Sequence, residues 1–180
     1  SATIQSSTFH ANTAGTAGAV LSSGPTLIEN SSFDNNDATT DFGGALYVSG
    51  DANIQNSTFE ANSAAVSGGA IMAAGSAGST INNSTFVNNL ADNIGAAINM
   101  FSEGGGLVSN STFWNNIGFP NQDATVSVSL DGGYSLFANI LANSLDTQPV
   151  LATGGYSDHG ANLFTGDSFV VTSAGEGASL

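Results

Sequence analysis

The chain of 180 residues contains neither lysine nor arginine, although it carries 14 acidic side chains. In a domain of ordinary composition about a quarter of the residues are charged, and both signs are present. A formal net charge of −14 repels phosphate backbones and anionic lipid headgroups, which excludes binding to nucleic acid and to anionic membrane surfaces. The absence of cations also excludes every mechanism that needs a Schiff-base lysine or an arginine clamp.

Cysteine is also absent, so disulfides and thiolate metal sites are impossible. No apolar run is long enough to span a membrane, and the N-terminus does not resemble a signal peptide. The chain is instead rich in glycine (23 residues), asparagine (20) and phenylalanine (11), a composition typical of a folded protein with many turns and few helices. It begins with serine inside a repeat, so we expect a piece of a longer protein.

One six-residue motif recurs along the chain and starts with an aliphatic residue, ends with phenylalanine and contains Ser-Thr or Ser-Ser. Five copies occupy Ile4–Phe9, Ile28–Phe33, Ile54–Phe59, Ile81–Phe86 and Val108–Phe113, and a degenerate sixth copy is Leu136–Leu141. A second motif, Gly-Gly-Ala followed by an aliphatic residue, lies between the copies, as at 43–46 and 68–71. The hexads advance by 24 to 28 residues per copy.

The repeat predicts the fold. Each hexad is too short for a helix and rich in β-branched residues, so we expect one short strand in the hexad and another in the Gly-Gly-Ala motif. Such a unit cannot bury its apolar side chains alone, and stacking at about 4.8 Å places each phenylalanine over the previous one. We therefore predict an all-β protein, a single-stranded right-handed parallel β-helix (solenoid) of about six rungs, a rung being one turn of the coil. A leucine-rich repeat, a calcium-binding nonapeptide roll and a propeller fit the pattern less well.

The repeated residues are interpreted as structural. We expect a stacked aromatic column of Phe9, Phe33, Phe59, Phe86 and Phe113 inside the coil. Three residues after each phenylalanine stands an asparagine, and we expect these side chains to form a hydrogen-bonded ladder at a turn with positive φ: Asn12, Asn36, Asn62, Asn89 and Asn116. The glycine pairs indicate a tight corner or a close approach between rungs.

The paired motifs resemble the repeats of polymorphic outer membrane proteins, which are bacterial surface and autotransporter passengers. The matching Phe-x-x-Asn segments are 9–12, 33–36, 59–62, 86–89 and 113–116, and the Gly-Gly-Ala-aliphatic segments are 43–46 and 68–71. The segment 95–98 departs from the second motif by one glycine. The resemblance covers residues 1–116 well and 117–145 loosely, and it implies an adhesive or structural passenger at the cell surface or outside the cell.

Three carboxylates, Asp34, Asp37 and Asp41, lie close together in the sequence and form a candidate calcium site, because calcium prefers several oxygen ligands. Their spacing matches no known calcium loop and is not repeated in other rungs, so the interpretation that we favour is a solvated acidic rim. No other cofactor is expected. Because the 14 acidic groups have no lysine or arginine to pair with, we expect calcium or other solution cations to screen them.

The sequence argues against catalysis. Polysaccharide-cleaving β-helices use basic residues or clustered aspartates, and the only candidate here is Asp158-His159-Gly160, with no second aspartate at the matching place one rung earlier. His10 is expected to face outward, because the equivalent residue changes in every copy. Asn30, Asn56, Asn83 and Asn110 each open an Asn-Ser-Ser/Thr triplet, formally a glycosylation acceptor, which we interpret as part of a strand with outward-facing hydroxyls.

We divide the chain into regular rungs at residues 1–143 and irregular terminal coils with a tail at residues 144–180, within one domain. The leading functional prediction is a non-catalytic structural or adhesive segment of a larger extracellular or cell-surface protein, with a cell-surface or glycan partner. One alternative is a fibre or sheath subunit that self-associates end to end through exposed strand edges. The other is a β-helix that binds or cleaves carbohydrate.

Overall fold

The computed structural model describes residues 1–102, 104–118, 126–131, 134–142, 148–153, 156–158, 163–165 and 170–171, with side chains at 1–100, 104–118 and 135–139. Every described regular element is a β-strand, and each pairing between strands is parallel. No helix able to cross a membrane occurs among these residues. The strands form four sheets that run along the coil, which confirms the predicted all-β parallel β-helix.

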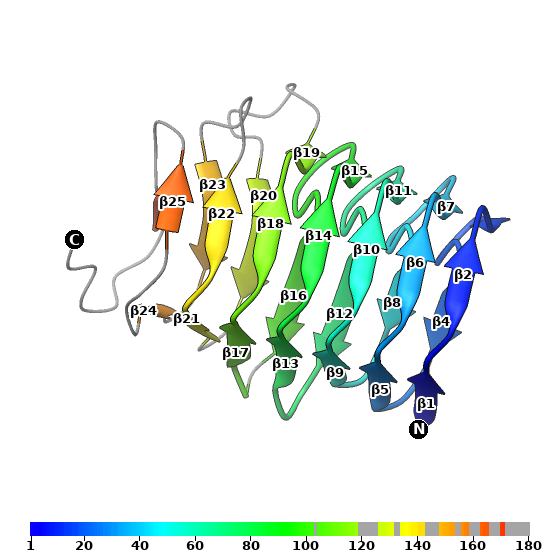
Figure 1. Cartoon of the computed structure of the whole chain (residues 1–180), viewed down its shortest axis with the longest axis horizontal. Helices are drawn as coiled ribbons and strands as arrows, with labels where there is room; N and C mark the ends of the chain where they lie inside the picture. The colour runs from blue at the N-terminus through cyan, green and yellow to red at the C-terminus, as the bar shows by residue number, and fades with distance from the viewer. Residues whose placement is uncertain are drawn as a thin grey trace.

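Sheets I and II each hold seven strands. Sheet I consists of β1 (Ala2–Gln5), β5 (Thr26–Glu29), β9 (Ala52–Gln55), β13 (Ser79–Asn82), β17 (Gly106–Ser109), β21 (Tyr134–Phe137) and β24 (Tyr156–Asp158). Sheet II consists of β2 (Thr8–His10), β6 (Ser32–Asp34), β10 (Thr58–Glu60), β14 (Thr85–Val87), β18 (Thr112–Trp114), β22 (Ile140–Ala142) and β25 (Leu163–Thr165). Figure 1 shows the strands of sheet II side by side from β2 to β25.

Sheet III is formed by five two-residue strands, and sheet IV by seven strands of two to six residues. Sheet III consists of β3 (Thr13–Ala14), β7 (Asp37–Ala38), β11 (Ser63–Ala64), β15 (Leu90–Ala91) and β19 (Ile117–Gly118). Sheet IV consists of β4 (Val20–Ser22), β8 (Leu46–Val48), β12 (Ile71–Gly75), β16 (Ile98–Ser102), β20 (Val126–Asp131), β23 (Gln148–Thr153) and β26 (Val170–Val171). Strands β23 to β26 continue sheets I, II and IV beyond residue 143, and the division of the chain at that residue stays a prediction.

The hexad is bent, which corrects the prediction that it forms one strand. Its first two residues end a strand of sheet I, and its last two lie in the following strand of sheet II. Between them the chain turns at a residue with positive φ, such as Asn56 at 50°. The Gly-Gly-Ala motif likewise precedes a strand: β8 and β12 begin at the aliphatic residues Leu46 and Ile71. A bend is needed because one rung must close around its core within 24 to 28 residues.

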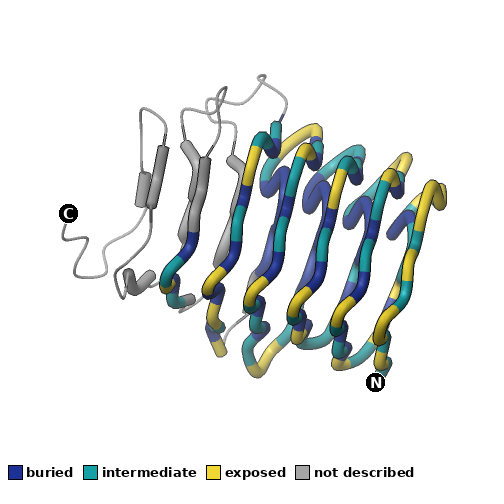
Figure 2. The backbone as a smooth tube through the Cα atoms, viewed as in Figure 1, coloured by how far each residue is buried: buried dark blue, intermediate teal, exposed yellow. Residues whose placement is uncertain are grey.

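The core is built from residues that occupy the same register in successive rungs. Phe59 pairs with Phe33 and Phe86, and Ile54 pairs with Ile28 and Ile81. The members of both columns from the second to the fourth rung are fully buried, and Figure 2 shows buried and more exposed positions alternating along the strands. This alternation follows from the strand period of two residues, which directs successive side chains to opposite faces.

The two glycines of the Gly-Gly-Ala motif have different roles. The first adopts positive φ, +70° at Gly43 and +69° at Gly68, and Ala17 takes this position in the first rung with φ of 53°. The second, for example Gly69, leaves no room for a side chain, because a Cβ atom there would lie 2.0 Å from the carbonyl oxygen of Ala96. Both the tight corner and the close approach of rungs expected from the sequence are therefore present, at different residues.

Candidate functional site

The repeated phenylalanines form one continuous stack inside the coil. Neighbouring ring centroids are 4.8 to 5.0 Å apart, and adjacent ring planes differ by 3° to 4°, from Phe9 through Phe33, Phe59 and Phe86 to Phe113. The last four rings are almost completely buried. They therefore offer no surface to a ligand and act as the structural column of the core.

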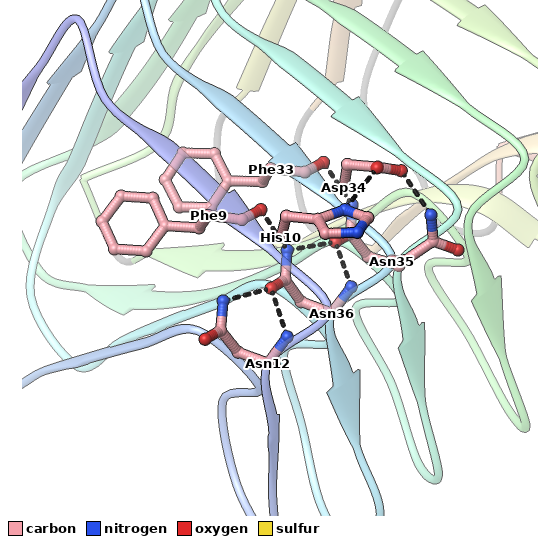
Figure 3. A network of polar contacts seen from close by, with 8 residues as sticks. Phe9, His10, Asn12, Phe33, Asp34, Asn35 and Asn36 are labelled. Carbon is pink, nitrogen blue, oxygen red and sulfur yellow. Dashed lines mark hydrogen bonds and ion pairs between the residues drawn. The ribbon is translucent and has the colours of Figure 1, made fainter.

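The repeated asparagines form a second buried column beside this stack. The Nδ2 atom of Asn62 donates to Oδ1 of Asn89 in the next rung at 3.0 Å and to the carbonyl oxygen of Phe33 in the previous rung at 3.0 Å. Its Oδ1 accepts bonds from the backbone nitrogen and the Nδ2 of Asn36 at 3.0 and 2.9 Å. Figure 3 shows the start of this ladder, where Asn12 donates to Asn36. Each amide in the middle of the ladder is thus fully used within the protein.

The ladder asparagines do not take the positive φ that we expected of them. That conformation belongs to the residue just before each one: Ala11, Asn35, Ala61, Asn88 and Asn115, with φ of 50° to 55°. The turn therefore precedes the ladder position, and the ladder side chain can point into the coil. Alanine occupies the turn position in two of the five rungs, whereas asparagine occupies the ladder position in all five. The selection for asparagine is therefore stronger at the ladder than at the turn.

A serine ladder, which the sequence analysis missed, runs along the corner between sheets I and II. Its members were expected to point outward, but Ser31, Ser57, Ser84 and Ser111 are buried. The Oγ of Ser57 accepts from the backbone nitrogen of Ser31 at 3.2 Å and donates to the carbonyl oxygen of Gln55 at 2.8 Å. Asn139 continues this ladder in the degenerate sixth hexad by accepting from the backbone of Ser111 at 3.0 Å. The signal in the sequence was the serine present at the same place in all five full hexads.

The three aspartates of the candidate calcium site do not converge. Asp34 contacts His10 at 2.7 Å, Asp41 accepts from the Thr16 hydroxyl at 2.7 Å, and Asp37 accepts from the Ser63 hydroxyl. Within the part of the chain that the structure describes, no group of three acidic or histidine side chains is placed to hold a metal ion. Each carboxylate instead has its own partner on a neighbouring rung.

The outward-facing side chains of sheet II form a column that changes chemically at every rung. It consists of His10, Asp34, Glu60, Val87 and Trp114, which are in register. His10 and Asp34 form an ion pair when the imidazole is protonated, and the His10 side chain is 63% exposed (Figure 3). Trp114, the only tryptophan in the sequence, is 54% exposed, whereas tryptophan residues are on average largely buried. This column therefore contains one exposed aromatic side chain, which is in register with Val87 on one side and Ala142 on the other.

A shallow open depression of about 280 Å³ lies along sheet III. Asp37, Ser63 and Leu90 line it from successive strands, and Asp92 lines it from the segment after β15. Asp37 already accepts the Ser63 hydroxyl, and no histidine lines the depression. The depression thus holds two carboxylates, of Asp37 and Asp92, and a serine hydroxyl that is bonded to one of them.

The catalytic candidate Asp158-His159-Gly160 lies outside the residues whose side chains are described. The backbone of Asp158 is in β24, where it pairs with Leu136 of the previous rung. Leu136 belongs to the aliphatic column of the core.

The stacked parallel coils and their buried ladders define a parallel β-helix protein. The sequence profile described as "Right handed beta helix region" matches residues 1–90, which is half of the 180-residue chain. The chain therefore belongs to the right-handed β-helix family, and the handedness predicted from the length of the repeat is confirmed. Searches of curated proteins and of solved structures found no match.

Proposed function

We propose that the chain is a non-catalytic segment of an extracellular surface protein and acts as a rigid spacer or adhesive stalk. The observation that carries this proposal is the contrast between the inside and the outside of the coil. The recurring phenylalanines, aliphatic residues, ladder asparagines and serines line the inside of the coil, whereas the outward column from His10 to Trp114 differs at every rung. Selection has therefore preserved the scaffold at each rung, as a spacer requires, and has not preserved a repeated side chain on the outward face of sheet II.

Two further features support an extracellular location. The repeats resemble those of polymorphic outer membrane proteins, which are surface passengers. Exposed strand positions such as Thr3, Asn53 and Glu60 have room for long side chains, yet the whole chain contains no lysine or arginine. Trypsin-like proteases, which cleave after these residues, therefore have no site in the protein, an advantage in protease-rich surroundings.

The proposal predicts short monomeric particles without polysaccharide-cleaving activity. The purified chain would be imaged by negative-stain electron microscopy, and the release of reducing ends would be measured on a panel of acidic and neutral polysaccharides. Turnover that is lost in Asp37→Asn or Asp158→Asn, but not in Asp51→Asn, would establish an enzyme and overturn the proposal. Long polymers formed by the chain alone would instead support a fibre subunit.

Carbohydrate binding without cleavage is a second candidate, and the exposed indole of Trp114 favours it. Aromatic faces commonly present an apolar platform with a polar edge at binding surfaces. Val87 is in register with this indole, and Thr85 and Thr112 stand two residues earlier on the same two strands of sheet II. The amides of Asn88 and Asn115 are joined by a 2.7 Å hydrogen bond at the adjacent corner. Hydroxyl and amide groups beside an aromatic ring suit a sugar, which has apolar faces and hydroxyl edges.

Trp114 also makes this candidate measurable, because it is the only tryptophan. If the surface binds sugars, titration with cello-, chito- and galacto-oligosaccharides should give a saturable change in tryptophan emission. Calorimetry should then show affinity about tenfold weaker for Trp114→Ala, which corresponds to about 1.4 kcal/mol. Leu21→Ala, which alters another exposed apolar side chain on sheet IV, should bind like the parent. Equal affinity in the parent and in Trp114→Ala would remove this candidate.

A further inference from the structure

Four asparagines form an exposed column at the corner between sheets I and II. Asn30, Asn56, Asn83 and Asn110 are all exposed, and their φ values are 48° to 51°. Each is followed by a buried serine of the ladder and then by a half-buried hydroxyl residue, Ser32, Thr58, Thr85 or Thr112, at the start of a sheet II strand. The structure thus moves the Asn-x-Ser/Thr triplets, which the sequence analysis placed within strands, to a protruding turn.

The turn itself does not require asparagine. At the same corner Ser6 adopts φ of 46° and Ala138 adopts φ of 53°. The next corner, before the asparagine ladder, provides an internal comparison. At 35, 88 and 115 the turn residue of this corner is asparagine, and the residue two positions later has no hydroxyl group. At 11 and 61 the residue two positions later is threonine or serine, and the turn residue is alanine. Acceptor triplets are therefore absent from the second corner and occur in four successive rungs at the first.

We infer that this asparagine column is a site of N-linked glycosylation. The reaction needs a separate glycosyltransferase and an activated sugar, a glycosyl diphosphate. The Nδ2 atom of the asparagine attacks the anomeric carbon, the bond from that carbon to the phosphate oxygen breaks, and the diphosphate leaves with the electron pair. The proton lost from Nδ2 passes to a base of the transferase, and the product is a neutral glycosyl amide. The inference goes beyond the proposed function and shares with it only the extracellular location.

The spacing of the rungs limits how many sugars the column can hold. Neighbouring parallel strands are about 4.8 Å apart, so a sugar on one asparagine obstructs the asparagines directly above and below it. Asn83 is further restrained, because its Nδ2 donates to Oδ1 of Asn56 at 2.7 Å. In the described part of the chain, Asn30, Asn56 and Asn110 donate no side-chain hydrogen bond from Nδ2. We therefore expect at most two sugars per chain, on Asn110 and on either Asn30 or Asn56.

The test uses the full chain, folded and unmodified, with a purified transferase specific for Asn-x-Ser/Thr and its nucleoside diphosphate sugar. Intact mass spectrometry should show a gain of one or two sugars. Peptides made with Glu-specific and Asp-specific proteases, which are needed because trypsin has no site, should place them on the predicted asparagines and never on two adjacent rungs. Protein purified from its source organism should carry sugar on the same peptides.

Matched variants separate the acceptor role from a folding role. Changing the four corner asparagines to serine, the residue found at this corner as Ser6, should abolish the mass gain, and Asn110→Ser alone should remove one site. A fifth acceptor triplet, at Asn82, remains in this variant but should stay unlabelled, because Asn82 lies within β13 and its Nδ2 donates to Ser109 at 2.8 Å. Changing Asn35, Asn88 and Asn115 to alanine should leave labelling unchanged. Labelling of heat-unfolded chain but not of folded chain would overturn the inference, as would unmodified peptides in the protein from its source. Neither result would change the particle shape or the lack of turnover on which the proposed function is tested.

Discussion

Replacing Phe59 with alanine is expected to lower the free energy of unfolding by about 3–5 kcal/mol. The ring lies in the middle of the aromatic stack, with centroid distances of 4.8 Å to Phe33 and 5.0 Å to Phe86. It is fully buried, so its removal loses apolar contacts and leaves a cavity between two rungs whose backbones are held in register by hydrogen bonds. Because parallel ladders fix the spacing of those rungs, the coil cannot collapse to fill the space.

Trp114→Ala is the matched control, because it removes an aromatic ring that is 54% exposed on the adjacent outward-facing column. A substitution on the surface away from buried features usually changes stability by no more than about 0.5 kcal/mol. Both variants would be compared with the parent by chemical denaturation followed by circular dichroism. If Phe59→Ala unfolded at the same denaturant concentration as the parent, the stack would contribute nothing to stability, and our account of the core would be wrong.

Asn62→Leu should destabilise the protein by a similar amount, about 4 kcal/mol, although leucine has the same number and branching of side-chain heavy atoms as asparagine. The change removes four buried hydrogen bonds: those that Asn62 accepts from the backbone nitrogen and Nδ2 of Asn36, and those that it donates to the carbonyl oxygen of Phe33 and to Oδ1 of Asn89. Two of these groups keep another partner, because Asn36 Nδ2 also donates to the carbonyl oxygen of Phe9 and Asn89 Oδ1 also accepts from the backbone nitrogen at position 62. A buried group that loses its hydrogen bond costs about 1–3 kcal/mol. The estimate of about 4 kcal/mol takes the low end of this range for each of the four lost bonds, because two of the groups keep another partner and part of the coil can relax.

Asn88→Ala provides the comparison for the ladder variant. This asparagine is exposed and occupies the turn just before the ladder, where Ala11 and Ala61 adopt the same backbone conformation in other rungs. Its replacement should shift the denaturation midpoint far less than Asn62→Leu does. Equal effects of the two substitutions would show that the asparagines matter for the turn, and the ladder would then have no special role in stability.

The two buried polar columns explain how this coil closes without a single internal lysine or arginine. Turns between sheets leave backbone groups unpaired, and in this protein asparagine and serine side chains satisfy them one rung at a time. The backbone nitrogen of Asn36, for example, is bonded to Oδ1 of Asn62, and that of Ser31 to Oγ of Ser57. The outward-facing side chains are therefore not needed to pair these backbone groups. They can differ from rung to rung, as from His10 to Trp114, and they can carry the negative charge.

The recurrence of residues along the sequence identifies the columns of the coil but not the direction in which each side chain points. A repeat at 24 to 28 residues correctly predicted the columns of Phe59 and Ile54, because equivalent residues of successive rungs stack in a parallel coil even when the turns between them differ in length. Alternation along a single strand predicted that Ser57 faces outward. The bend at Asn56 changes which residues of the hexad face inward, and Ser57 is buried. Short polar residues are compatible with both a strand and a corner, so composition alone does not distinguish the two.

By itself, the sequence determined the fold class, the approximate length of the rung and the identity of the stacked columns, since each depends only on periodicity. It also excluded mechanisms that need lysine or arginine, because the chain contains neither residue. Only the tertiary structure decided which groups meet. It separated Asp34, Asp37 and Asp41 onto different partners, placed the carbonyl oxygen of Ala96 against Gly69, and put the acceptor asparagines on an exposed corner. Such contacts depend on φ and on the offset between rungs, which sequence spacing does not specify.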